Sequence, residues 1–159
     1  MADDKIAIKA GIIAMAQVGA LLRLLLGMLN VPDLHQMSSV LCANCVGCFI
    51  IGLVNAAKPW LLRRDLCPMY HALAVGFCGA LTSFSTWQLE VARWLVWWPN
   101  AAMQDVPGGK AKLFPRIVSA FSALLTELCI SCLAYRAGLF VASLACPDAT
   151  VWNELEPEE

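Results

Sequence analysis

The chain has 159 residues, 60% of them hydrophobic and only 14% charged, with a formal net charge of −1. Soluble domains have close to half apolar and about a quarter charged residues. Because the apolar residues here form long runs, the composition indicates an integral membrane protein of a single domain. The charge gives no sign of nucleic-acid binding. Neither a phosphate loop nor a Ser/His/Asp or Cys/His arrangement typical of an enzyme is evident in the sequence.

Four apolar segments are long enough to cross a bilayer, which takes about 20 predominantly apolar residues. They are predicted at about 6–29, 37–57, 70–98 and 114–145. Backbone groups in lipid must be satisfied within their own segment, so each segment is expected to be a helix. We therefore predict an all-α membrane protein with one four-helix domain over 1–147. The acidic stretch 148–159 is expected to be a disordered tail.

Polar loops containing proline separate the segments. "NVPD" follows the first, "KPWLLRRD" ends the second, and "PNAAMQDVPGGKAK" lies between the third and the fourth. The N-terminus is acidic before the first apolar run, so this run is expected to be kept as a span rather than removed as a signal peptide.

Basic residues do not fix the orientation of these segments. The two sides of the membrane would carry Lys5, Lys9, Lys58, Arg63 and Arg64 on one side and Arg93, Lys110, Lys112 and Arg116 on the other. Five against four is no decisive bias under the positive-inside rule. Such a balance is expected of a chain that inserts in both orientations, but an inexact count would give it too.

One polar residue stands out in each of the first two predicted spans. Arg23 is deep in the first, where a charge is costly; it either forms an anion site or vestibule, or its side chain snorkels to a headgroup. Asn44 in the second can donate to an anion or hydrogen-bond a neighbouring helix. Cys42, Cys45 and Cys48 have the spacing of an iron–sulfur motif, but on a helix they fan around its axis, so close helix packing is favoured.

The last two predicted spans carry further polar groups. Glu90 and Arg93 share a face late in the third. Glu127 in the fourth is protonated, paired with Arg23, or beside water, and the sequence does not decide. A stripe of hydroxyls follows the same span, and its members form either a polar track or bonds to the preceding turn. They are Ser119, Ser122 and Thr126. His35 and His71 lie at segment ends, so no metal site is proposed for them.

The third span contains "GFCGALTSFSTW", residues 76–87, which combines helix-weakening glycines with hydroxyl side chains. One interpretation is a helix broken within the membrane, which offers carbonyls and hydroxyls to an ion. The other is a kinked span with small-residue packing. Irregular backbone at that depth is tolerated only inside protein or beside water.

These residues closely resemble a known family. "GFCGALTSFSTWQLE" resembles the "GFCGGLTTFSTFSxE" signature of the Fluc/CrcB fluoride channels. "GALLRLLL" is similar to that family's "G-x-x-x-R-W", and "LCANCVGCFIIG" to its "GTLxxNxxGxFxxG". The motifs occur in order on the expected spans. The tryptophan in "FSTW", the long third loop and the cysteines look more like eukaryotic fluoride exporters, in which two such domains are fused.

The resemblance implies an architecture and a function. The third helix is expected to be broken mid-membrane, and two four-helix domains are expected to pack antiparallel with fluoride pores along their interface. The second domain would be another copy of this chain, in dual topology, or a homologous domain. The function implied is a passive channel in the cell membrane that exports fluoride and confers fluoride resistance. Alternatives are a non-conducting half of a two-domain exporter, or a small multidrug-type transporter, although that class centres on a glutamate in the first helix, where this chain has Arg23.

The resemblance also implies roles for individual residues. Arg23 would belong to the pore vestibule, Asn44 would donate hydrogen bonds to fluoride, and Phe84 would present a ring edge. Further pore positions are Ser85, Thr86, Trp87, Glu90, Ser122 and Thr126. The backbone carbonyls of Gly79 and Thr82 would hold a structural Na⁺ at the dimer centre. Three positions depart from the family pattern: Trp87 replaces a second phenylalanine, Ala80 replaces a glycine, and Glu127 adds an acid.

Overall fold

The computed structural model describes residues 2–28, 40–96 and 113–145. These residues are almost entirely helical, and none of them is in a strand, which confirms the predicted all-α class for the described part of the chain. The elements are α1 (Ala2–Met28), α2 (Leu41–Ala56), α3 (Lys58–Arg63), α4 (Cys67–His71), the π-helix η1 (Ala72–Cys78), α5 (Gly79–Leu81), α6 (Phe84–Val96) and α7 (Leu113–Ala145).

Two helices are long and apolar enough to cross a membrane, over Lys5–Met28 in α1 and Ile117–Ala145 in α7. They match the first and fourth predicted spans closely. The second predicted span corresponds to α2, which is apolar but shorter. The ends of the second and third predicted spans, at 37–39 and 97–98, and the predicted tail, 148–159, lie outside the described residues. The number of spans therefore stays a prediction.

The third predicted span consists of several consecutive elements. From α4 the chain continues through η1 and α5 to Leu81, and α6 begins at Phe84. Thr82 is extended, with φ −77° and ψ 148°. Both glycines suspected of breaking the helix lie in helical backbone; Gly79, for example, has φ −63° and ψ −34°. The interruption therefore follows the glycines and falls at Thr82 and Ser83.

Glycines instead allow two close helix crossings. Where α1 crosses η1, a Cβ on Gly76 would lie 2.6 Å from the Ile12 carbonyl oxygen, and one on Gly19 would collide with the backbone at Phe77. Where α2 crosses α7, a Cβ on Gly138 would collide with the Phe49 carbonyl. Small residues are expected at such contacts because helices in lipid associate by close packing.

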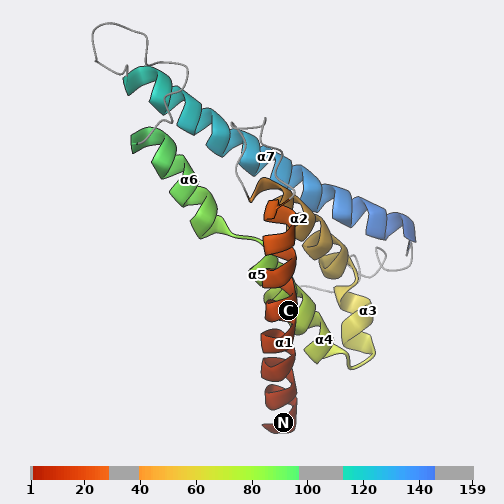
Figure 1. The fold of residues 1–159 in the computed structure, drawn as a ribbon. Helices are drawn as coiled ribbons and strands as arrows, with labels where there is room; N and C mark the ends of the chain where they lie inside the picture. The colour runs from red at the N-terminus through yellow and green to blue at the C-terminus, as the bar shows by residue number, and fades with distance from the viewer. Residues whose placement is uncertain (1, 29–39, 97–112, 146–159) are drawn as a thin grey trace, which may run out of the picture.

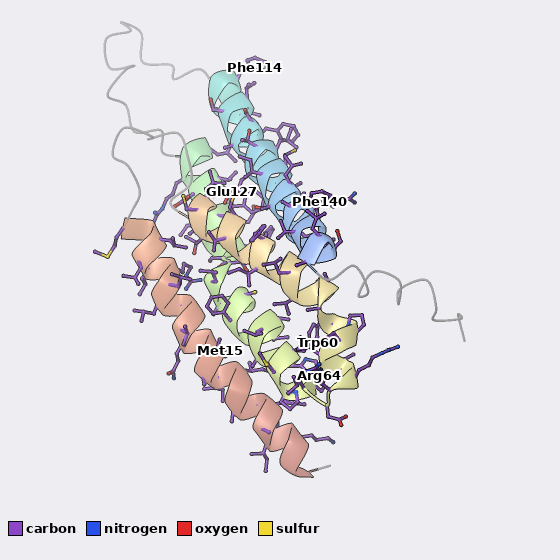
Figure 2. All side chains as sticks on the ribbon, turned by 90° about the vertical axis from the view of Figure 1, so that its right-hand side faces the viewer. Met15, Trp60, Arg64, Phe114, Glu127 and Phe140 are labelled. Carbon is purple, nitrogen blue, oxygen red and sulfur yellow. The ribbon has the colours of Figure 1, made fainter. Side chains whose placement is uncertain are left out.

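The helices form two groups that meet at α2 and the interruption. Figure 1 shows α1 beside α4, η1 and α5, and α6 running beside the first part of α7 away from that group. The helix α2 packs along α7 and also touches η1 and α5. In Figure 2, Glu127 lies along α7 between Phe114 and Phe140, close to α2. The short connection between α5 and α6 is therefore the place where α2, α6 and α7 can be linked.

Gly138→Val is expected to destabilise the chain, because the added Cβ collides with a backbone carbonyl rather than with a flexible side chain. Overpacking of this kind costs about 1–3 kcal/mol, so the Tm measured in detergent should fall by several degrees. Gly27→Ala is the control, because no described atom outside its own stretch of helix lies within 4 Å of its Cβ position and alanine favours helix. An unchanged Tm for Gly138→Val would contradict the α2–α7 crossing.

Candidate ion-binding site at the helix interruption

One buried side chain joins the three elements that meet at the interruption. Asn44 on α2 is only 6% exposed. Its Oδ1 accepts a hydrogen bond from the Ser83 backbone N–H at 2.8 Å, and its Nδ2 donates to Glu127 Oε1 on α7 at 3.0 Å. Ser83 and Glu127 are also buried. A buried amide that uses both its ends in this way fixes three segments relative to one another.

Ser83 explains why the helix restarts where it does. Its Oγ accepts the Thr86 backbone N–H at 3.3 Å and lies 2.7 Å from Thr86 Oγ1. Its carbonyl accepts the Trp87 N–H at 3.3 Å, which is the first hydrogen bond of α6. A serine whose side chain bonds the N–H three residues later is an N-cap. Ser83 therefore starts α6 while its own N–H bonds α2.

The same hydrogen bonds remove the usual helical donors from the backbone carbonyls of Gly79 and Thr82. In a continuous α-helix the Ser83 N–H would bond the Gly79 carbonyl, and the Thr86 N–H would bond the Thr82 carbonyl. Here those N–H groups donate to Asn44 Oδ1 and Ser83 Oγ. The Thr82 hydroxyl donates to the Cys78 carbonyl at 2.9 Å. Gly79 and Thr82 thus have carbonyls whose usual helical donors are engaged elsewhere.

Two aromatic rings stand at the start of α6. Phe84 is 69% exposed, whereas Trp87 is 7% exposed. Their centroids are 5.4 Å apart and their planes meet at 79°, so the pair is edge-to-face. The indole Nε1 of Trp87 is buried and has no hydrogen-bond partner among the described residues. This tryptophan adds a donor that a phenylalanine at the same position would lack.

The other predicted pore residues lie at varied depths. Arg23 on α1, Thr86 and Glu90 on α6 are half-buried. Ser85, Ser122 and Thr126 are exposed. Thr86 and Trp87 are hydrogen-bonded to Ser83, and the Phe84 ring lies against the Trp87 ring. The pore roles of all the predicted residues stay predictions.

Two features of the site were not assigned from the sequence. The sequence assigns no individual role to Ser83, although a serine directly before the first residue of an apolar helical pattern is a recognisable start signal. For Glu127 the sequence leaves three alternatives open, and the structure gives it Asn44 as a hydrogen-bond partner. The sequence carries no local signal for that bond, because the two residues are 83 positions apart.

The cysteines of α2 do not form one surface. Cys42 is exposed, whereas Cys45 and Cys48 are half-buried. This spread follows from the helical fan of residues three apart. Among the described residues, no group of three or more His, Cys, Asp or Glu side chains is placed to hold a metal ion.

The fold and site describe a helical integral membrane protein with buried polar groups at an interrupted helix. Residues 10–145 match the family model described as "CrcB-like protein, Camphor Resistance (CrcB)". The chain therefore belongs to the CrcB-like family.

Individual relatives support this assignment. A protein of Klebsiella pneumoniae named "Fluoride-specific ion channel FluC" is 45% identical over 76 residues, which is 46% of this chain and 58% of that protein. A relative of the same name from Acinetobacter baumannii is 41% identical over the same length. "Fluoride-specific ion channel FluC 1" of Yersinia pseudotuberculosis is 36% identical over 101 residues, 59% of this chain and 78% of that protein. The match spans somewhat over half the length of the first two relatives.

Ser83→Ala is expected to lower the stability of the chain by about 1 kcal/mol, the usual effect of removing an N-cap hydroxyl. The measurement is the Tm in detergent. Ser85→Ala is the matched control, because Ser85 is exposed on the same turn. This variant should keep the free energy of unfolding within about 0.5 kcal/mol of the starting protein. Equal Tm values for the two variants would contradict the capping role of Ser83.

Proposed function

We propose that this chain is one half of a passive, fluoride-selective channel that exports fluoride across the cell membrane and so protects the cell from it. The observation that carries the proposal is the Asn44 amide bound at the helix interruption, which the exposed Phe84 directly follows in the chain. Several relatives are named fluoride-specific ion channels, which supports the proposal.

The chemistry of the cluster suits a small, strongly hydrated anion. A pore for such an ion must replace its water with hydrogen-bond donors that do not hold it permanently. The carbonyl of Asn44 is turned to the Ser83 N–H, and one amide N–H is turned to Glu127. A primary amide has a second N–H, which would serve the anion. Hydroxyls of Ser85 and Thr86 and the ring edges of Phe84 and Trp87 would continue the track.

The working unit of the proposal is an antiparallel pair, either two copies of this chain or this chain with a homologous domain. The third segment would then be a helix broken within the membrane. Phe84 is 69% exposed and Val75 is 56% exposed on the chain alone, and the space at the Gly79 Cβ position is open. A partner that covers this surface would shield the irregular backbone from lipid, where it is not tolerated. Each chain supplies half of each pore.

A structural Na⁺ at the centre of the pair is part of the same proposal. Hard cations bind backbone carbonyl oxygens. The carbonyls of Gly79 and Thr82 fit this need, because their usual helical donors are bonded to Asn44 and Ser83. The ion would hold the two interruptions together, and it could not share its site with fluoride because carbonyls only accept.

One observation favours a second candidate, a non-conducting half that supports a conducting partner domain. Glu127 places a carboxyl group 3.0 Å from the amide nitrogen of Asn44. A negative charge so close to the proposed fluoride ligand would oppose anion binding.

Fluoride efflux from liposomes tests the proposal and separates the two candidates. The purified chain is reconstituted in vesicles loaded with potassium fluoride, valinomycin carries the counter-ion, and a fluoride electrode follows release. Efflux of fluoride but not of chloride is expected from the chain alone. Efflux only after co-reconstitution with a homologous domain would rule out the homodimer version, and unchanged efflux when this chain then carries Asn44→Asp would support the supporting-half candidate. Release in neither case, from correctly folded protein, would overturn the fluoride proposal.

Asn44→Asp is expected to lower fluoride efflux at least about tenfold, because the carboxylate loses both N–H donors and repels anions. Aspartate can still accept the Ser83 N–H, so the interruption keeps its hydrogen bond. Efflux is measured with the electrode assay. Cys42→Ala, on an exposed position two residues earlier on α2, is the control and should conduct normally. Normal efflux through Asn44→Asp would remove Asn44 from the pore.

Phe84→Ile is expected to reduce fluoride efflux while the protein keeps its oligomeric state in detergent, because isoleucine has similar bulk but no ring edge. The matched control is Phe140→Ile on α7, where the phenylalanine is also largely exposed, at 63%, and lies far along α7 from Glu127 (Figure 2). Equal efflux from the two variants would show that the ring of Phe84 does not act on the ion.

A further inference from the structure

We propose that Glu127 is a positioning residue: it holds the Asn44 amide with the carbonyl facing the Ser83 N–H and one N–H left for the anion. The role of that remaining N–H rests on the proposed function, whereas the orientation of the amide does not. Nothing in the family resemblance assigns this role, since the acid is a departure from the family pattern.

The geometry gives the amide two opposite partners. Glu127 is 4% exposed, and its Oε1 accepts from Asn44 Nδ2 at 3.0 Å. On the other side, the Ser83 N–H donates to Asn44 Oδ1 at 2.8 Å. The oxygen and nitrogen ends of an amide have nearly the same shape, so only their partners decide which way it points. A flipped amide would set N–H against N–H at Ser83 and oxygen against oxygen at Glu127.

A second asparagine on α2 shows what simple bridging between these helices needs. Asn55 Nδ2 donates to the Tyr135 hydroxyl on α7 at 3.4 Å, and the Tyr70 hydroxyl donates to Asn55 Oδ1 at 3.1 Å. This bridge joins α2, α7 and α4 with neutral partners. A buried carboxyl group is costlier than a tyrosine, so bridging alone gives no reason for an acid at position 127.

The partners of Asn44 and Asn55 also differ in whether they can both donate and accept hydrogen bonds. A hydroxyl both donates and accepts, so Tyr135 and Tyr70 would tolerate either orientation of the Asn55 amide. At Asn44 the backbone N–H of Ser83 can only donate, and the Glu127 Oε1 accepts from the amide nitrogen. The Asn44 amide is therefore held in one orientation at the place where the proposed anion track needs an N–H.

The test compares Glu127→Met with Glu127→Gln. Both side chains have the length of glutamate, but only glutamine keeps an oxygen that can accept from Asn44. We expect fluoride efflux at least about fivefold slower for Glu127→Met, the size that corresponds to one lost hydrogen bond, and efflux restored in Glu127→Gln. Tyr135→Phe, which removes the acceptor from Asn55 on the same two helices, should conduct normally. Glu127→Ala is made alongside, so that the comparison does not depend on methionine fitting the site.

A second measurement does not depend on fluoride. Hydrogen exchange of the Ser83 backbone N–H reports whether Asn44 still accepts its hydrogen bond. It is expected to be at least about fivefold faster in Glu127→Met and Glu127→Ala, and unchanged in Glu127→Gln and Tyr135→Phe. If the unaltered chain conducts no fluoride either alone or with a homologous domain, the proposed function fails, and the exchange rates still decide the positioning role.

Three results would overturn the inference. The first is a normal rate of Ser83 N–H exchange in both Glu127→Met and Glu127→Ala, together with normal fluoride efflux if the unaltered chain conducts. The second is Glu127→Gln as impaired as Glu127→Met in a folded protein, because the charge and not the acceptor would then matter. The third is Tyr135→Phe with the same accelerated Ser83 exchange, because any loss of polar contact between α2 and α7 would then have this effect.

Discussion

The hydrogen bond from the Ser83 backbone N–H to Asn44 is the constraint on which the rest of the site depends. An interrupted helix leaves backbone N–H groups without their usual carbonyl acceptors, and leaving one unsatisfied in an apolar environment costs several kcal/mol. Asn44 supplies the acceptor from a neighbouring helix. To do so, α2 must approach the interruption closely. Gly47, one turn further on α2, permits this approach, since a Cβ there would lie 2.5 Å from Thr82 Cγ2. The asparagine and the glycine of "LCANCVGCFIIG" thus serve one contact.

The same hydrogen bond separates acceptors from donors at the interruption. Once the Ser83 N–H is turned to Asn44, the Gly79 carbonyl loses its usual helical donor, and an oxygen suited to a cation becomes available. The amide that takes the N–H directs its own N–H groups elsewhere, one of them to Glu127. The proposed cation site and the proposed anion donor would therefore both follow from one displaced N–H, and we infer that this is why the two proposed sites are neighbours.

Sequence reasoning succeeded where a residue type has few alternatives in lipid. The helices α1 and α7 follow from long, predominantly apolar runs, and Asn44 stands out because an amide within such a run needs a partner. The position of the interruption was not predictable from glycine content: Gly76 is needed for close packing against Ile12 on α1, and only the extended Thr82 ends the helix. Two further features depend on how distant segments pack, which a local sequence pattern cannot predict. They are the π-helix over Ala72–Cys78 and the hydrogen bond between Asn44 and Glu127.

Part of the site is exposed on a single chain, and this exposure restricts what can cover that surface in the membrane. The polar atoms at Asn44, Ser83 and Glu127 are buried within the chain, so this half of the cluster is complete by itself. Phe84, by contrast, is largely exposed directly after the interruption, and the Gly79 Cβ position is open. Lipid satisfies an aromatic ring but not a backbone carbonyl, such as that of Gly79, whose usual helical donor is bonded elsewhere. We infer that the surface which covers Gly79 must itself be protein, and that a second interruption approaching from an inverted copy would meet the need of both chains at once.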